Sequence, residues 1–258
     1  MPHLPGLDRR TARTSRTSCE TLLALWERGL GHQGWERGDA LLQESDDITA
    51  PRTPGGRTLG ERTVRLLKLH AALFGTEMEL LSHCPSCGSV AHFTSDCEAL
   101  TEQLPAVASD AAQRLELDDV AIEFRLPVTA DIAAASTENT DEGFARRVLD
   151  RCVLTCTRDG EDVSVSALPD AVLDALSRRM EMLDPGATVS FALDCPQCAT
   201  HWNARLDVGQ LVWQKVQVSA ERLLLDIDVL ARAYGWTEED VLSLSPARRA
   251  AYLQIVTA

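Results

Sequence analysis

Apolar residues recur three or four positions apart along most of this sequence, and this spacing predicts a chain built mainly from amphipathic helices. Gly or Pro follows several of these segments, as is typical of helix ends. Near the C-terminus, Thr237 to Asp240 resembles a capping box and Ser245-Pro246 is a typical helix start. The predicted helices span residues 19–29, 35–45, 60–75, 129–136 with Thr129 as its cap, 140–154, 168–186, 208–235, a short helix after Thr237, and 246–256.

Alternation of apolar and polar residues predicts β-strands in other parts of the chain. Residues 120–128 alternate in this way and are predicted to form a strand. Alternation also flanks two similar turns, "HCPSCG" at residues 83–88 and "CPQC" at residues 195–198. Each turn is therefore predicted to be the tip of a β-hairpin, the second of which spans residues 188–208.

The two Cys-Pro-x-Cys turns predict a metal site. Such a turn brings two sulfur atoms together, which is half of a four-thiolate zinc site. The 107 residues from 88 through 194 would then be an insertion, which is acceptable because the cost of loop closure grows only logarithmically with length. We predict that one Zn²⁺ is shared by Cys84, Cys87, Cys195 and Cys198. Two alternatives stay open: incomplete or metal-free turns, and one pair completed by Cys97, His83, His92 or His201.

A site of four thiolates leaves no open coordination position, so the predicted metal is structural. The chain has no phosphate-binding glycine loop, no G-x-S-x-G and no H-E-x-x-H motif. We therefore expect no enzyme, since a zinc hydrolase would need an open metal site. The spacing of Cys152 and Cys156 predicts packed residues at a helix end, and Cys19 and Cys97 are expected to be ordinary thiols.

The net charge of −14 is distributed unevenly. Residues 1–65 hold 10 Arg and 9 Asp/Glu, whereas residues 66–258 hold 15 Lys/Arg and 30 Asp/Glu. An acidic body repels phosphate backbones and suits a basic or mixed protein surface, so we expect a protein partner and no nucleic acid. No apolar run reaches the ~20 residues of a spanning helix, and no secretory signal is recognisable. With cysteines typical of reduced thiols, we expect a cytoplasmic protein without a membrane partner.

These elements predict an α+β fold, predominantly α-helical, with two short β-hairpins in a zinc-ribbon-like unit and a C-terminal helical cluster. A Pro/Gly-rich connector follows the second helix, at residues 46–61. The predicted parts are a disordered Arg-rich tail (1–17), an N-terminal helical region (18–82), a first zinc-knuckle hairpin (83–97), an inserted α/β segment (98–187), a second zinc-knuckle hairpin (188–208) and C-terminal helices (209–258).

The C-terminal helices contain the residues that we predict to bind a partner. Their outline is similar to a helix-turn-helix, which opens an alternative function as a zinc-ribbon regulator that binds nucleic acid. The acidic body argues against this alternative, so the two arginines are expected to pair with Glu238, Glu239 or Asp240, or to contact a protein. The predicted partner-binding residues are Tyr234, Trp236, Arg248, Arg249 and Tyr252.

Several quoted segments carry a resemblance to a known family. The sequence "ARAYGWTEEDVLSLSPARRAAYLQIV" closely resembles the C-terminal signature of the T-even-phage baseplate hub assembly chaperone family, whose relatives occur in gene clusters of extracellular contractile injection systems. The segments "LLKLHAALFGTEMELLSHCPSCG" and "FALDCPQCATHWNARLDVGQLVWQKV" are similar to the injection-system members. The resemblance covers roughly residues 18–258. It implies a non-enzymatic assembly factor whose partners are hub, spike or tube-initiator proteins.

Overall fold

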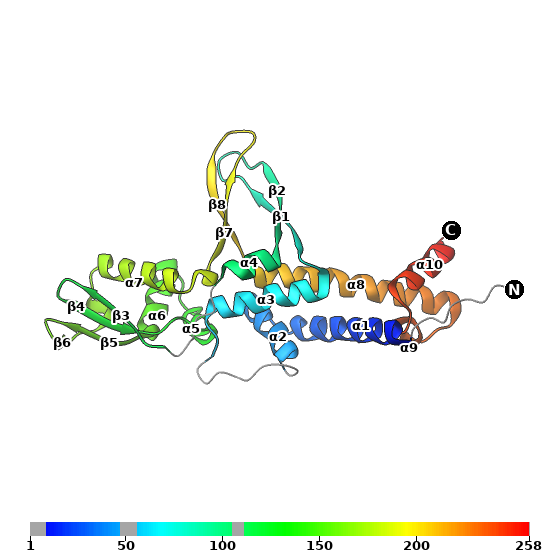
Figure 1. Ribbon diagram of the computed structural model, residues 1–258, viewed down its shortest axis with the longest axis horizontal. Helices are drawn as coiled ribbons and strands as arrows, with labels where there is room; N and C mark the ends of the chain where they lie inside the picture. The colour runs from blue at the N-terminus through cyan, green and yellow to red at the C-terminus, as the bar shows by residue number, and fades with distance from the viewer. Residues whose placement is uncertain (1–8, 47–55, 105–110, 258) are drawn as a thin grey trace. The chain divides into compact units, whose positions relative to one another are not determined.

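The computed structural model describes residues 9–46, 56–104 and 111–257, and it has the predicted α+β fold with a predominance of helix (Figure 1). The chain forms two compact units. We call them the helical unit (residues 1–48, 72–75 and 208–258) and the hairpin unit (residues 49–71 and 76–207). Among the described helices, none combines the length and the apolar composition that crossing a bilayer requires.

The helical unit is built around one long helix, α8 (Val208–Tyr234). Its buried residues form one stripe along the helix, and this face packs against α1 (Arg9–Leu30) and α2 (Trp35–Asp46). Trp213 is buried against Gly29, where a β-carbon would overlap the indole ring. Two short helices, α9 (Glu238–Leu242) and α10 (Pro246–Thr257), complete this unit, and α9 begins with the predicted capping box of Thr237 and Asp240.

The hairpin unit contains a four-stranded antiparallel sheet of order β3-β4-β5-β6. Its strands are β3 (Gln113–Leu117), β4 (Val120–Phe124), β5 (Val153–Arg158) and β6 (Glu161–Asp162). The helices are α5 (Thr129–Ala135), α6 (Asp141–Cys152) and α7 (Asp170–Leu183), with 3-10 turns η1 (Val165–Ala167) and η2 (Pro185–Ala187). Alternate residues of β4 are buried, which follows from the alternating pattern, and join a core with Leu149, Leu173 and Leu176.

The helix α3 (Leu59–Phe74) is held at its N-terminus by a residue that is distant in sequence. The Gly60 N–H donates a hydrogen bond of 2.9 Å to Oδ2 of buried Asp184, and the Glu61 N–H donates one of 3.1 Å to Thr58 Oγ1. These bonds satisfy free N–H groups of the first helical turn. The backbones cross closely here, because a β-carbon on Gly186 would lie 2.8 Å from the Gly60 Cα.

Two separate two-stranded hairpins carry the Cys-Pro-x-Cys turns. The first consists of β1 (Glu77–His83) and β2 (Val90–Asp96), and the second of β7 (Val189–Asp194) and β8 (His201–Leu206). A short helix, α4 (Cys97–Gln103), follows β2 and is capped by the Asp96 carboxylate. Figure 1 shows the two hairpins side by side, with their turns at the same end.

Several sequence predictions differ from the structure. Helix α1 begins at Arg9 instead of residue 19, so residues 9–17 are not a disordered tail; no Gly or Pro interrupts the helix before Gly29. Residues 1–8 of that predicted tail lie outside the described residues. Cys156 lies on β5 and not on a helix end, because α6 stops at Cys152. Thr129 is the first residue of α5 rather than its cap, which is Val128.

Candidate metal centre

The two turns repeat the same backbone geometry over six residues, Cys84 to Ser89 and Cys195 to Thr200. In the first, the Cys84 N–H donates to the Ser89 carbonyl and the Gly88 N–H to the Cys84 carbonyl, both at 2.9 Å. In the second, the equivalent two bonds are both 3.0 Å. Each turn is therefore a zinc knuckle in its backbone form, with the two sulfur atoms on the same side.

Each knuckle needs one residue in the left-handed region of backbone conformation. Gly88 has φ 74° and the equivalent Ala199 has φ 56°. Glycine adopts this conformation freely, whereas alanine does so at a cost of about 1–2 kcal/mol. The second knuckle keeps its shape in spite of this cost because the surrounding hydrogen bonds hold it.

One face of each hairpin packs against the other hairpin, and Phe93 and Phe191 lie on these packed faces. The rings of Phe93 and Phe191 meet edge to face, with centroids 5.2 Å apart. The indole N–H of Trp202 donates a hydrogen bond of 3.2 Å to Ser82 Oγ. These contacts set the relative position of the two knuckles at the hairpin tips.

The four predicted ligands come together at the tips. Cys84 and Cys198 have sulfur atoms 3.6 Å apart, and those of Cys87 and Cys195 are 3.5 Å apart. All four sulfur atoms lie within 4.8 Å of one another. Tetrahedral zinc with Zn–S bonds of about 2.3 Å places sulfur atoms about 3.8 Å apart, so the site fits this ion. Cys84 and Cys195 are buried, whereas Cys87 and Cys198 face solvent.

Hydroxyl groups that follow each knuckle contact the sulfur atoms. Ser89 Oγ lies 3.1 Å from Cys195 Sγ in the opposite knuckle and 3.3 Å from Cys87 Sγ in its own. Thr200 Oγ1 contacts only Cys198 Sγ, at 3.2 Å. The Ser89 hydroxyl, followed by the Cys198 N–H, lowers the pKa of the Cys195 thiol to about 6, which favours the thiolate that binds metal.

The other residues that we considered as ligands lie elsewhere. Cys97 Sγ is 3.3 Å from Nδ1 of buried His70, which is a separate contact between α4 and α3. His83 and His92 are exposed on strands β1 and β2, and His201 pairs with Asp194. Over the described ranges 9–46, 56–104 and 111–257, the four cysteines are the only group of three or more His, Cys, Asp or Glu residues with the geometry to hold a metal.

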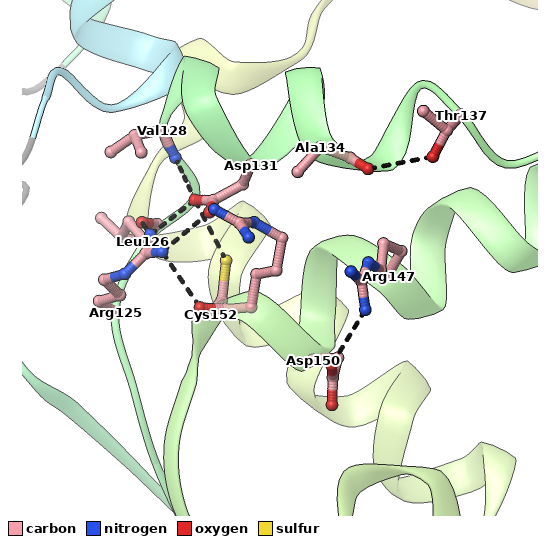
Figure 2. Close-up of polar contacts among 10 residues, drawn as sticks. Arg125, Leu126, Val128, Asp131, Ala134, Thr137, Arg147, Asp150 and Cys152 are labelled. Atoms are coloured by element: carbon pink, nitrogen blue, oxygen red, sulfur yellow. Dashed lines mark hydrogen bonds and ion pairs between the residues drawn. The ribbon is translucent and has the colours of Figure 1, made fainter.

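A buried ionic cluster in the hairpin unit was not predicted (Figure 2). The Asp131 carboxylate has no solvent exposure and accepts hydrogen bonds of 2.6 and 2.8 Å from Arg125, 3.0 Å from Arg151 Nε and 3.0 Å from the Val128 N–H. The cluster joins the end of β4 to α5 and to the end of α6. The alternating pattern could not identify it, because Arg125 follows a strand and Asp131 looks like any first-turn acid of a helix.

Burial and hydrogen bonding have opposite effects on the pKa of the Asp131 carboxyl. Burial raises the pKa of Asp131, but the hydrogen bonds from Arg125, Val128 and Arg151 outweigh burial and hold that pKa below its ordinary value. Burial, and then the Asp131 charge, raise the pKa of the neighbouring Cys152 thiol to about 12. Cys152 is therefore protonated and buried, which is the opposite of a reactive cysteine.

The predicted partner-binding residues divide into two groups. Tyr234, Trp236 and Tyr252 form one aromatic cluster, with ring centroids 4.6 to 5.7 Å apart. Arg248 is exposed, but Arg249 is only 9% exposed. Its guanidinium lies 3.5 Å from Asp226 and 3.7 Å from Cys19 Sγ, so its charge is paired with an acidic residue of α8. Arg249 is therefore a core residue of the helical unit, since its neighbours on α1 and α8 surround it.

The comparisons with known proteins identify a family through the segment that holds the metal centre. The model of the T4 bacteriophage base plate protein family matches residues 39–207, which is 169 of the 258 residues and includes both knuckles. The match ends at residue 207, before the C-terminal signature, and it covers the hairpin unit together with residues 39–48 and 72–75 of the helical unit. No curated protein sequence and no solved structure matches the chain. The chain, matched over about two thirds of its length, belongs to the T4 bacteriophage base plate protein family.

Proposed function

We propose that this protein is a non-enzymatic assembly factor for the hub or spike region of the baseplate of a contractile injection system or phage-tail-like particle. It acts by binding other baseplate proteins in the cytoplasm. The observation that carries the proposal is the family match over both knuckles. The resemblance of the C-terminal helices to hub assembly chaperones supports the finer role.

We further propose that one structural Zn²⁺ is held by Cys84, Cys87, Cys195 and Cys198. Bound zinc would supply a cross-link and no reactive position, since all four ligands come from the protein. The chain's own residues have three further roles. The backbone turns orient the sulfur atoms, and the Phe93–Phe191 contact positions the hairpins relative to each other. The four cysteines with their zinc ion, which we call the clasp, would hold the hairpins as a rigid support for partner contacts.

Two experiments test the proposal. In the first, the tagged protein is affinity-purified from cells that assemble particles. In the second, its gene is deleted and the yield of complete particles is measured. We expect recovery of hub, spike or tube-initiator proteins, and a loss of complete particles after deletion. Normal particle yield after deletion, together with no baseplate protein in the purified sample, would refute the proposal. The Asp170→Asn variant, which changes an exposed carboxylate, serves as the matched control.

The alternative function as a nucleic-acid-binding regulator has less support. It depended on Arg248 and Arg249, and Arg249 is occupied inside the helical unit by Asp226. An acidic body also predicts little retention on DNA. Retention of the purified protein on DNA that falls steeply with salt would restore this alternative.

A further inference from the structure

The first hairpin has one face that the second hairpin does not cover. Met78 and Leu80 are buried and point to the packed side, as expected for alternate positions of β1. On the opposite side, Leu81 is 62% exposed and Val90 is 45% exposed. Leu81 pairs with His92 and His83 pairs with Val90, so the two apolar residues are diagonal neighbours in adjacent rows. We call the side that carries these four residues the outer face of the first hairpin.

The second hairpin provides an internal comparison. Counting from the cysteines, Ala192 is equivalent to Leu81, and His201 is equivalent to Val90. Ala192 and His201 are also exposed, and His201 pairs with Asp194. The same knuckle and hairpin therefore form with small or polar residues at these positions. The packing of the hairpin does not account for an exposed leucine beside an exposed valine, and such a pair next to a rigid turn is suited to contact with another protein.

The residues around this apolar pair indicate which kind of partner surface would be complementary to it. Glu77 and Glu79 are exposed on the same face of β1, nearer its base. Asp96 lies opposite Glu77 in the register of the two strands. The hydrogen bond from the Ala99 N–H keeps the pKa of the Asp96 carboxyl below its ordinary value, so the Asp96 carboxylate is ionised. The apolar pair is thus bordered by carboxylates on the side nearer the base of the hairpin, and His92 and His83 are the cross-strand partners of Leu81 and Val90. Residues 66–258 also hold twice as many acidic as basic residues. A complementary surface has an apolar pocket bordered by Lys or Arg.

We propose that the outer face of the first hairpin, centred on Leu81 and Val90, is a docking surface for a baseplate protein whose contact surface is an apolar pocket with a basic border. This inference rests on the proposed function, because it assigns that function to a surface. It also moves the expected contact away from the C-terminal aromatic cluster. The four-cysteine clasp lies directly beyond this face, so it fixes the strands that present the two residues.

Photo-crosslinking tests the surface directly. A benzoylphenylalanine residue replaces Leu81 in one variant and Ala192 in the matched control, in cells that assemble particles. We expect a crosslinked baseplate protein, identified by mass spectrometry, from position 81 and at least about tenfold less from position 192. Equal crosslinking at both positions, crosslinking of position 81 only to a second copy of this chain, or capture only of proteins outside the baseplate would overturn the proposal.

Substitution gives an independent measurement. The double variant Leu81→Asp and Val90→Asp is expected to lower the recovered baseplate protein at least about tenfold, whereas Ala192→Asp leaves it unchanged. All three positions are exposed, so both proteins should fold, which equal metal content and circular dichroism would check. Recovery of the partner by wild-type protein should fall as salt rises, because the border is charged. Unchanged recovery with the double variant contradicts the proposal.

The failure of this inference is distinguishable from the failure of the proposed function. If wild-type protein recovers a baseplate protein and the double variant recovers it equally well, only the assignment of the surface is wrong. If wild-type protein recovers none, the proposed function is wrong and the surface assignment falls with it.

Discussion

The sulfur atoms of Cys84 and Cys198 lie 3.6 Å apart, although 114 positions separate the two residues in the sequence. The contact closes a loop that contains the whole inserted α/β segment. A metal ion at this point would therefore hold together two distant stretches of chain, and its removal should loosen both hairpins at once.

The first prediction concerns metal content. Purified protein should contain about one Zn²⁺ per chain, and Cys84→Ser or Cys195→Ser should each abolish binding, because a structural site needs all four thiolates. Elemental analysis measures this. Cys97→Ala is the control, since its thiol contacts His70 and not the cluster. Retention of a full equivalent of zinc by Cys195→Ser would show that the two knuckles do not share one ion.

The second prediction concerns Ser89, whose hydroxyl contacts sulfur atoms of both knuckles. Ser89→Ala should weaken zinc binding by about 10-fold, as is typical when a partner of a metal ligand is removed. Thr200→Val should have a smaller effect, because Thr200 contacts only Cys198. Competition with a coloured chelator measures both affinities. Equal losses of zinc affinity in the two variants would mean that the Ser89 contact to the opposite knuckle does not contribute to zinc binding.

The third prediction concerns the close approach of Gly60 to Asp184. A β-carbon on Gly60 would overlap the Asp184 carboxylate and lie 2.7 Å from its Cγ. Gly60→Ala should therefore displace the group that caps α3 and lower the free energy of unfolding by about 2–3 kcal/mol. Urea unfolding measures the change. Gly31→Ala, where a β-carbon would lie an ordinary 4.0 Å from the Arg28 carbonyl oxygen, should alter stability by less than about 1 kcal/mol.

The fourth prediction concerns the ionic cluster of Asp131. Asp131→Asn should lower the free energy of unfolding by about 3 kcal/mol near neutral pH, at the low end for a buried pair because Arg125 and Arg151 are partly exposed. The folded-state pKa of Asp131 lies below the unfolded-state value, so its contribution is present above pH of about 4 and is lost as the pH falls through the folded-state pKa.

Urea unfolding at a series of pH values therefore distinguishes this cluster from general acid effects. The stability difference between wild type and Asp131→Asn should narrow below pH of about 4. Asp170→Asn removes a surface pair with Arg146 and should cost less than about 1 kcal/mol. A difference between wild type and Asp131→Asn that stays constant into acid would contradict the assigned role.

Local patterns predicted the elements whose signals lie within a few residues. Helix α8 was expected at 208–235 and spans Val208–Tyr234, and α10 begins at Pro246 as predicted. The four-cysteine cluster was also predictable, because a Cys-Pro-x-Cys turn is incomplete alone and the chain has only two of them. The zinc ion itself stays a prediction, since four neighbouring sulfur atoms establish the geometry and not the ion.

Features that depend on distant partners were missed. Residues 153–158 continue the apolar spacing of α6, but they form strand β5 because β4 offers a pairing edge. Arg249 looks like a surface arginine of α10, and only the packing of α1 and α8 around it shows that it is buried. Ile255 is apolar, but it is 66% exposed at the end of α10. In each of these cases the structure depends on a packing partner that is distant in the sequence, and the local spacing of apolar residues does not show that partner.

The order of the two knuckles in the chain also has a consequence during translation. Cys84 and Cys87 leave the ribosome while Cys195 and Cys198 have yet to be made. At about 5–20 residues per second, the intervening 107 residues take about 5–20 s to synthesise. During that interval the first hairpin has two thiols without their partners and an uncovered Phe93. The clasp can close only after residue 198 has emerged from the ribosome. A closed clasp therefore distinguishes chains that have been synthesised this far from shorter nascent or truncated chains.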